Sequence, residues 1–149
     1  MEQAIASIEF VTFSHATEDP ERVLKALKNL LPVTISEDVD YGEEELTGHY
    51  GNPIRILRAK VSKKEAIDQT VRLLASNLSS LDKLSLGQEM RYKGDRDRDL
   101  FMRLDKQAAY LGKIQLSFRD PIKIRFRFKL HPKSHKKFLE IYQEMGLIA

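Results

Sequence analysis

Alternating apolar and basic side chains between residues 122 and 129 form the stretch of this sequence best suited to bind an anion. The basic members recur at every second position, which puts them on one face of a β-strand, and they are Lys123, Arg125, Arg127 and Lys129. Like charges roughly 6.6–6.8 Å apart repel one another unless an anion lies across them. The stretch therefore predicts a strand that binds a polyanion such as a nucleic-acid backbone. The alternative is a solvated strand face whose charges prevent edge-to-edge pairing.

A second alternating stretch, residues 113–118, predicts the partner strand of a β-hairpin, with Phe118 among its core residues. A three-residue loop over 119–121 brings the apolar residues of both strands to one face, whereas a two-residue loop does not. In this register Lys113 lies opposite Arg127 on the outer face, and the row contains no acidic residue. Because a face kept only for solubility would gain from interspersed acids, their absence favours anion binding.

Basic residues elsewhere extend this predicted surface. Residues 54–61 are strand-like, but their apolar phase slips in the middle, and a β-bulge there would put Arg55, Arg58 and Lys60 on one face. A predicted C-terminal helix brings Lys133 beside the strand. Both additions enlarge the basic surface expected of a nucleic-acid-binding protein.

Length and composition limit the class of protein. The 149 residues are 42% hydrophobic, which is enough for one core and predicts a single domain over 1–149. No stretch reaches the roughly 20 apolar residues of a membrane span, and the N-terminus lacks the pattern of a signal peptide, so a cytoplasmic protein is expected. The absence of cysteine excludes disulfides, thiolate nucleophiles and cysteine-based zinc sites.

Charge is distributed unevenly along the chain. Residues 1–49 carry eleven acids against three bases, and residues 112–138 carry nine bases against Asp120 alone. Such asymmetry suggests a basic surface for an acidic partner or an electrostatic fit between parts of the protein. Charge-complementary patches would also suit a protein-protein adaptor, and the simplest version is a dimer in which the basic face contacts the acidic stretch 43–45 of a second copy.

Four separated motifs resemble an archaeal family of predicted RNA-binding proteins, described as a proposed exosome-associated subunit with a fold like ribosomal protein L5. The resemblance covers about residues 8–128 and is carried by residues 15–19, 48–53, 103–110 and 120–122. It implies an α+β fold, a two-layer sandwich in which helices lie on one face of a curved mixed or antiparallel sheet. It also implies an accessory role in RNA processing or degradation.

Two of these motifs carry candidate RNA contacts. His49 and Tyr50 could stack against an unpaired base, although the glycines and proline around them also suit a turn with Tyr50 at the edge of the core. Lys106 and Gln107 could contact RNA, although Asp105 could equally cap a helical turn and pair with Lys106. The sequence leaves both alternatives open.

Metal, cofactor and enzyme signatures are weak. The aspartates at 95, 97 and 99 lack the glycine and glutamate of a calcium loop, and the histidines at 131 and 135 lack a third ligand, so no metal or cofactor is expected. Phosphate-binding and nucleophile-elbow motifs are absent. An acid-base nuclease built around His15, His49 and Asp105 is a lesser alternative. The sequence therefore favours a non-catalytic RNA-binding protein that uses a basic sheet face.

Overall fold

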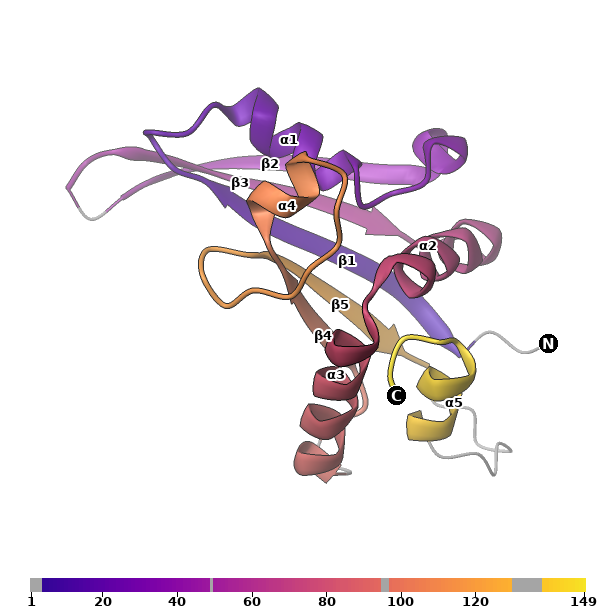
Figure 1. Cartoon of the computed structure of the whole chain (residues 1–149). Helices are drawn as coiled ribbons and strands as arrows, with labels where there is room; N and C mark the ends of the chain where they lie inside the picture. The colour runs from indigo at the N-terminus through magenta and orange to yellow at the C-terminus, as the bar shows by residue number, and fades with distance from the viewer. Residues whose placement is uncertain (1–3, 49, 95–96, 130–137) are drawn as a thin grey trace.

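A computed structural model of the chain describes residues 4–48, 50–94, 97–129 and 138–149. Five strands form one sheet in the order β2-β3-β1-β5-β4, and every neighbouring pair is antiparallel (Figure 1). The strands are β1 (Ile5–Ser14), β2 (Val39–Thr47), β3 (Pro53–Val61), β4 (Leu100–Leu104) and β5 (Ile122–Phe128).

Helices cover one face of this sheet. They are α1 (Pro20–Lys28), the 3-10 helix η1 (Val33–Asp38), α2 (Lys64–Asn77), α3 (Ser80–Lys93), α4 (Lys106–Tyr110) and α5 (Phe138–Glu144). This arrangement confirms the predicted two-layer α+β fold (Figure 1). None of the helices in the described part of the chain is long and apolar enough to span a bilayer.

The two faces of the sheet differ because apolar residues alternate with polar ones along β4, β5 and the first half of β1. Ile8, Phe10 and Phe126 are fully buried toward the helices, where Leu27 of α1 and Leu74 of α2 complete the core. The opposite face carries exposed charged side chains and is called here the open face. Those on β3 and β5 are Arg58, Lys60, Lys123 and Arg127.

The predicted hairpin between residues 113–118 and β5 is wrong. β5 instead lies between β1 and β4, and residues 113–118 contribute a single β-bridge from Leu116 to Leu104. The apolar face of β4 is as regular as that of 113–118, and its Met102 and Leu104 lie opposite Ile124 and Ile122. These residues fill the core positions assigned to the hairpin, and Phe118 is left 82% exposed.

The predicted bulge in β3 is also wrong. The register of β3 with β1 and with β2 is continuous, so Arg58 and Lys60 lie on the open face and Arg55 lies on the other. The slip in apolar phase is accommodated because Ile56 lies on the open face opposite Phe13, where it is only 6% exposed. Part of the open face is therefore apolar.

The position of β5 leads to a test with two matched substitutions. Phe126 is fully buried in the middle of β5, whereas Phe118 is 82% exposed. Phe126→Ala should lower the free energy of unfolding by about 3–5 kcal/mol because it leaves a cavity. Phe118→Ala should change it by no more than about 0.5 kcal/mol. Urea unfolding curves measure both values, and equal losses would contradict this topology.

Candidate nucleic-acid interface

Cross-strand pairing arranges the charged residues of the open face in rows. One row runs from Asp40 on β2 through Lys60, Glu9 and Arg125 to Phe101 on β4. Its charges alternate in sign across four strands. This row is therefore largely neutral, and it offers little net attraction to a polyanion.

Arg125 and Arg127 are held by acids that the sequence analysis did not place beside them. Arg125 donates to the Asp99 carboxylate from Nε at 2.8 Å and from Nη2 at 2.7 Å, and Arg127 Nη1 lies 3.5 Å from Glu9 Oε1. The hydrogen bond to Asp99 also raises the pKa of Arg125 above its usual value. The expectation of an acid-free basic row is wrong for these two residues, because the acids come from β1 and from the segment before β4.

A second row on the open face has a different composition. It runs from Gly42 through Arg58, Val11 and Lys123 to Arg103, and it contains no acid. Lys123 is exposed and Arg103 is half-buried, and neither forms an ion pair with a described residue. Arg58 has a long contact of 3.8 Å from Nη2 to Glu44 Oε2. We call Arg58, Lys123 and Arg103 the cationic row.

Arg103 is a member of this row that the sequence analysis did not select. It lies in a short strand whose buried residues are Leu100, Met102 and Leu104. The alternation in β4 was enough to show that Arg103 points to the other face. The hairpin predicted between 113–118 and β5 left no place for β4 beside β5, so Arg103 was not assigned to the basic face.

Aromatic rings lie beside the cationic row. Phe13 and Phe101 are half-buried on the open face. The Lys93 amine lies 5.0 Å from the centroid of the Phe101 ring, and the Arg125 guanidinium lies 5.5 Å from it. Both cations face a π-system, which is a favourable arrangement. The open face thus combines cations with aromatic and aliphatic surface.

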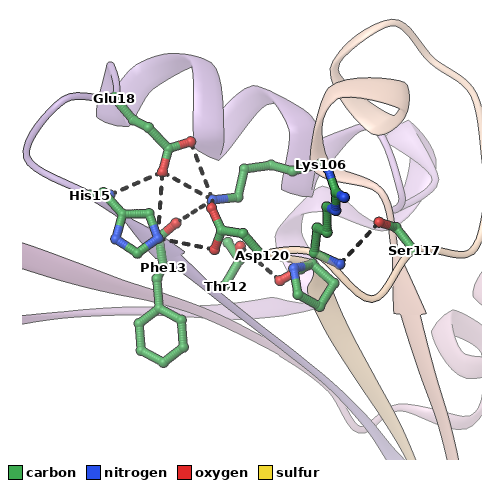
Figure 2. Close-up of polar contacts among 9 residues, drawn as sticks. Thr12, Phe13, His15, Glu18, Lys106, Ser117 and Asp120 are labelled. Atoms are coloured by element: carbon green, nitrogen blue, oxygen red, sulfur yellow. Dashed lines mark hydrogen bonds and ion pairs between the residues drawn. The ribbon is translucent and has the colours of Figure 1, made fainter.

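Lys106, the first residue of α4, lies in a separate polar cluster. Its amine donates to the Phe13 carbonyl at 2.6 Å, to Glu18 at 3.1 Å and to Asp120 at 2.8 Å, and its side chain is only 11% exposed (Figure 2). Asp105 caps α4 by accepting from the Ala108 amide at 2.8 Å. The structure therefore shows the capping that the sequence left open, whereas Lys106 pairs with Glu18 and Asp120 and not with Asp105.

His15 completes this cluster, whose other members are Glu18, Lys106 and Asp120. Its Nε2 lies 3.1 Å from Asp120 Oδ1, and its backbone amide donates to Glu18 at 3.1 Å. His15, Glu18 and Asp120 have ligand atoms within 4.8 Å of one another, a spacing that could suit a metal ion. The Lys106 ammonium already supplies the positive charge between Glu18 and Asp120 (Figure 2).

The remaining predicted contact residues do not gather at one place. Arg55 pairs with Glu43 at 3.1 Å, and Gln107 lines a hollow of about 380 Å³ between α1 and α4. The exposed residues are Lys113, Lys129 and Tyr50, and Tyr50 is 87% exposed, so it does not lie at the edge of the core. His49 and Lys133 lie outside the described residues. Of the sites predicted from sequence, the open face collects Arg58, Lys123, Arg125 and Arg127.

The polar cluster leads to a prediction about pH. Partial burial alone would raise the pKa of Asp120, but hydrogen bonds from Lys106 and His15 outweigh this effect and lower it. A carboxylate with a lowered pKa stabilises the fold above its unfolded pKa, and this stabilisation is lost as the pH falls through its folded pKa. Asp120→Asn should therefore reduce the free energy of unfolding at pH 7 more than at pH 3.

The size of this effect is limited because the Asp120 side chain is 43% exposed and solvent screens its ion pairs, so a loss of at most about 1 kcal/mol is expected at pH 7. Urea unfolding at both pH values measures it. The control is Asp68→Asn on α2, an exposed aspartate with no ion pair to a described residue. An equal loss for Asp120→Asn at pH 3 would show that its charge is not responsible.

Comparisons with known proteins agree with this architecture. A protein family described as RNA binding matches residues 7–128. The RNA-binding protein PAB1135 of Pyrococcus abyssi is 36% identical over 140 residues, covering 93% of this chain and 91% of that protein. The protein MJ0213 of Methanocaldococcus jannaschii is 32% identical over 136 residues, and the match covers 88% of this chain and 89% of that protein.

Solved structures show the same fold. Protein AF2318 from Archaeglobus fulgidus superimposes with a TM-score of 0.77 at 28% identity, covering 95% of this chain and 99% of that one. Mth689 from Methanothermobacter thermautotrophicus, at 24% identity, superimposes with a TM-score of 0.73 and covers 96% and 98%. Both are described as proteins of the family DUF54. By its match over residues 7–128, this chain belongs to the archaeal family described as RNA binding.

Proposed function

We propose that this protein binds RNA without cleaving it, and that the cationic row on the open face contacts the phosphate backbone. The observation that carries the proposal is the row itself, in which Arg58, Lys123 and Arg103 lie on neighbouring or next-neighbouring strands with no acid between them. The family to which the chain belongs and the name of its Pyrococcus abyssi relative support RNA as the polyanion.

The geometry of the row suits an extended backbone. Neighbouring strands lie about 4.7–4.9 Å apart, so the step from β3 through β1 and β5 to β4 covers roughly 14 Å. A phosphate chain crossing the strands can therefore meet the three cations in succession. Val11 separates Arg58 from Lys123 and offers apolar surface to a sugar or base.

Arg125 and Arg127 have a smaller part in this proposal than the sequence alone assigned to them. Their guanidinium groups already pair with Asp99 and Glu9, so a phosphate would have to compete with a carboxylate. Counterion release, which supplies most of the affinity for a nucleic-acid backbone, is correspondingly weaker at a neutralised site. The acid-free row is the stronger candidate.

The absence of catalysis belongs to the same proposal. His15, one of the two histidines of the acid-base nuclease alternative, contacts Asp120 and lies beside Lys106 in the polar cluster, and the other, His49, lies outside the described residues. Asp105, the carboxylate of that alternative, is occupied as the cap of α4. These contacts support a structural role for both residues. An accessory role beside an RNA-degrading complex such as the exosome extends the proposal, and the likeness to ribosomal protein L5 stays a prediction.

A salt series with paired charge reversals tests the cationic row. For single-stranded RNA, log K falls linearly with log salt concentration, with a slope of about −0.7 per phosphate contacted. The double variant Lys123→Glu and Arg103→Glu should bind every RNA tested more weakly and should flatten the slope by roughly 1.4, because two contacts are lost. Fluorescence anisotropy with labelled RNA measures both quantities.

The matched control is Arg72→Glu on α2, an exposed arginine in the helical layer with no ion pair to a described residue. It should leave the slope and affinity unchanged. If Arg72→Glu weakens binding as much as the double variant does, the interaction is a general charge effect and the cationic row is not the site. Turnover of the labelled RNA by the purified protein would contradict the non-catalytic part of the proposal.

A further inference from the structure

Phe118 is an exposed aromatic residue next to Ser117, whose amide donates to the carbonyl of Arg103 in the cationic row. Phe118 is 82% exposed, and it stands between Ser117 and Arg119 in the loop that connects α4 to β5. We propose that Phe118 stacks against an unpaired base, so that the ligand is single-stranded RNA. This inference rests on the proposed function and narrows it to one class of RNA.

The start of the loop is fixed by three hydrogen bonds. The Asp105 amide donates to the Gln115 carbonyl at 2.7 Å, and the Ser117 amide donates to the Arg103 carbonyl at 2.8 Å. The Leu116 amide donates to the Asp82 carboxylate of α3 at 3.2 Å. The backbone that carries Phe118 is therefore attached to β4 and to α3 on its N-terminal side.

The turn after Phe118 is fixed by the polar cluster. Asp120 has a positive φ of 41°, the only such value for a non-glycine residue in the described chain. Its carboxylate accepts from Lys106 at 2.8 Å and contacts His15 at 3.1 Å, while the Thr12 hydroxyl donates to the Pro121 carbonyl at 3.4 Å (Figure 2). An unfavourable backbone conformation persists only where its surroundings hold it in place.

An aromatic side chain on a fixed turn is well prepared to bind. A phenylalanine has few rotatable bonds, and a loop that is already ordered loses little further freedom on binding. A ring packed for stability would be buried, whereas this ring exposes most of its surface to water. The ring is therefore accessible to a ligand, and it contributes little to the core.

The surroundings of Phe118 favour RNA as that partner. The loop backbone at Ser117 contacts Arg103, and Arg103 lies opposite Lys123 at the end of the cationic row. Lys113 and Arg119 belong to the same loop and are exposed, and neither forms an ion pair with a described acid. The acid of the turn, Asp120, accepts a hydrogen bond from Lys106 and contacts His15, so its carboxylate is engaged within the polar cluster. Cations for phosphates and a ring for a base therefore meet at one edge.

The proposal distinguishes single strands from helices. In an A-form helix the bases are stacked on each other and cannot stack on an aromatic side chain, whereas the bases of single strands can. Stacking on one aromatic residue changes the affinity for a single strand by about 5- to 150-fold and depends little on sequence. Phe118 should therefore matter for single-stranded RNA and not for a duplex of equal length.

The test compares Phe118→Ala and Phe118→Trp in the full chain, with labelled oligouridine and an RNA duplex as the two probes. Phe118→Ala should weaken oligouridine binding by about 5- to 150-fold and Phe118→Trp should retain it, because every ring offers a π-face. Duplex affinity and the salt slope should stay the same in both variants, since no phosphate contact is lost. Because Phe118 is exposed, both variants should unfold at the urea midpoint of the parent protein.

The possible failures are distinguishable. If Phe118→Ala binds oligouridine as tightly as the parent while Lys123→Glu with Arg103→Glu does not, the stacking proposal is overturned and the proposed function stands. If Phe118→Ala weakens the duplex equally, the preference for unpaired bases is overturned. If the parent binds neither probe and Phe118→Ala instead abolishes binding of a purified protein partner, both proposals are overturned.

Discussion

The ammonium group of Lys106 connects three segments of the chain at one end of the sheet. It donates to Phe13 at the end of β1, to Glu18 in the turn before α1 and to Asp120 in the turn before β5. Phe13 and Glu18 lie far from Lys106 and from Asp120 in the sequence. A largely buried ammonium is costly unless its hydrogen-bond donors are all used, and here a carbonyl and two carboxylates use them. The same positive charge offsets the repulsion between those two carboxylates, so one ammonium group holds the three chain segments together.

Alternation of side chains made β5 predictable, because a strand between a core and solvent must place every second residue inside. It identified β5, whereas the layered α+β class was implied by the family resemblance. It could not choose the neighbours of β5, since both 113–118 and β4 offered alternating apolar faces. That choice depends on long-range packing, in which Met102 and Leu104 fill the positions beside Ile124 and Ile122.

The candidate site was predictable only in part for the same reason. Sequence alone located Lys123, Arg125 and Arg127 on one face, but their charge environment depends on which strands lie beside them. With β1 and β4 as neighbours, Glu9 and Asp99 neutralise the two arginines and leave Lys123 beside Arg103. The motifs of the family resemblance behaved differently: residues 15–19, 103–110 and 120–122 meet in the polar cluster, where they hold the loop of the proposed stacking residue.

The outer border of β2 has a consequence for the behaviour of the molecule in solution. β2 lies at the end of the sheet, and beyond Val39 all its residues are exposed, which is an arrangement that invites a second chain to add a strand. Three successive glutamates, Glu43 to Glu45, stand on this border. Glu43 and Glu44 pair with arginines of β3, whereas Glu45 has no ion pair to a described residue, so its carboxylate opposes the approach of the same edge of a second copy.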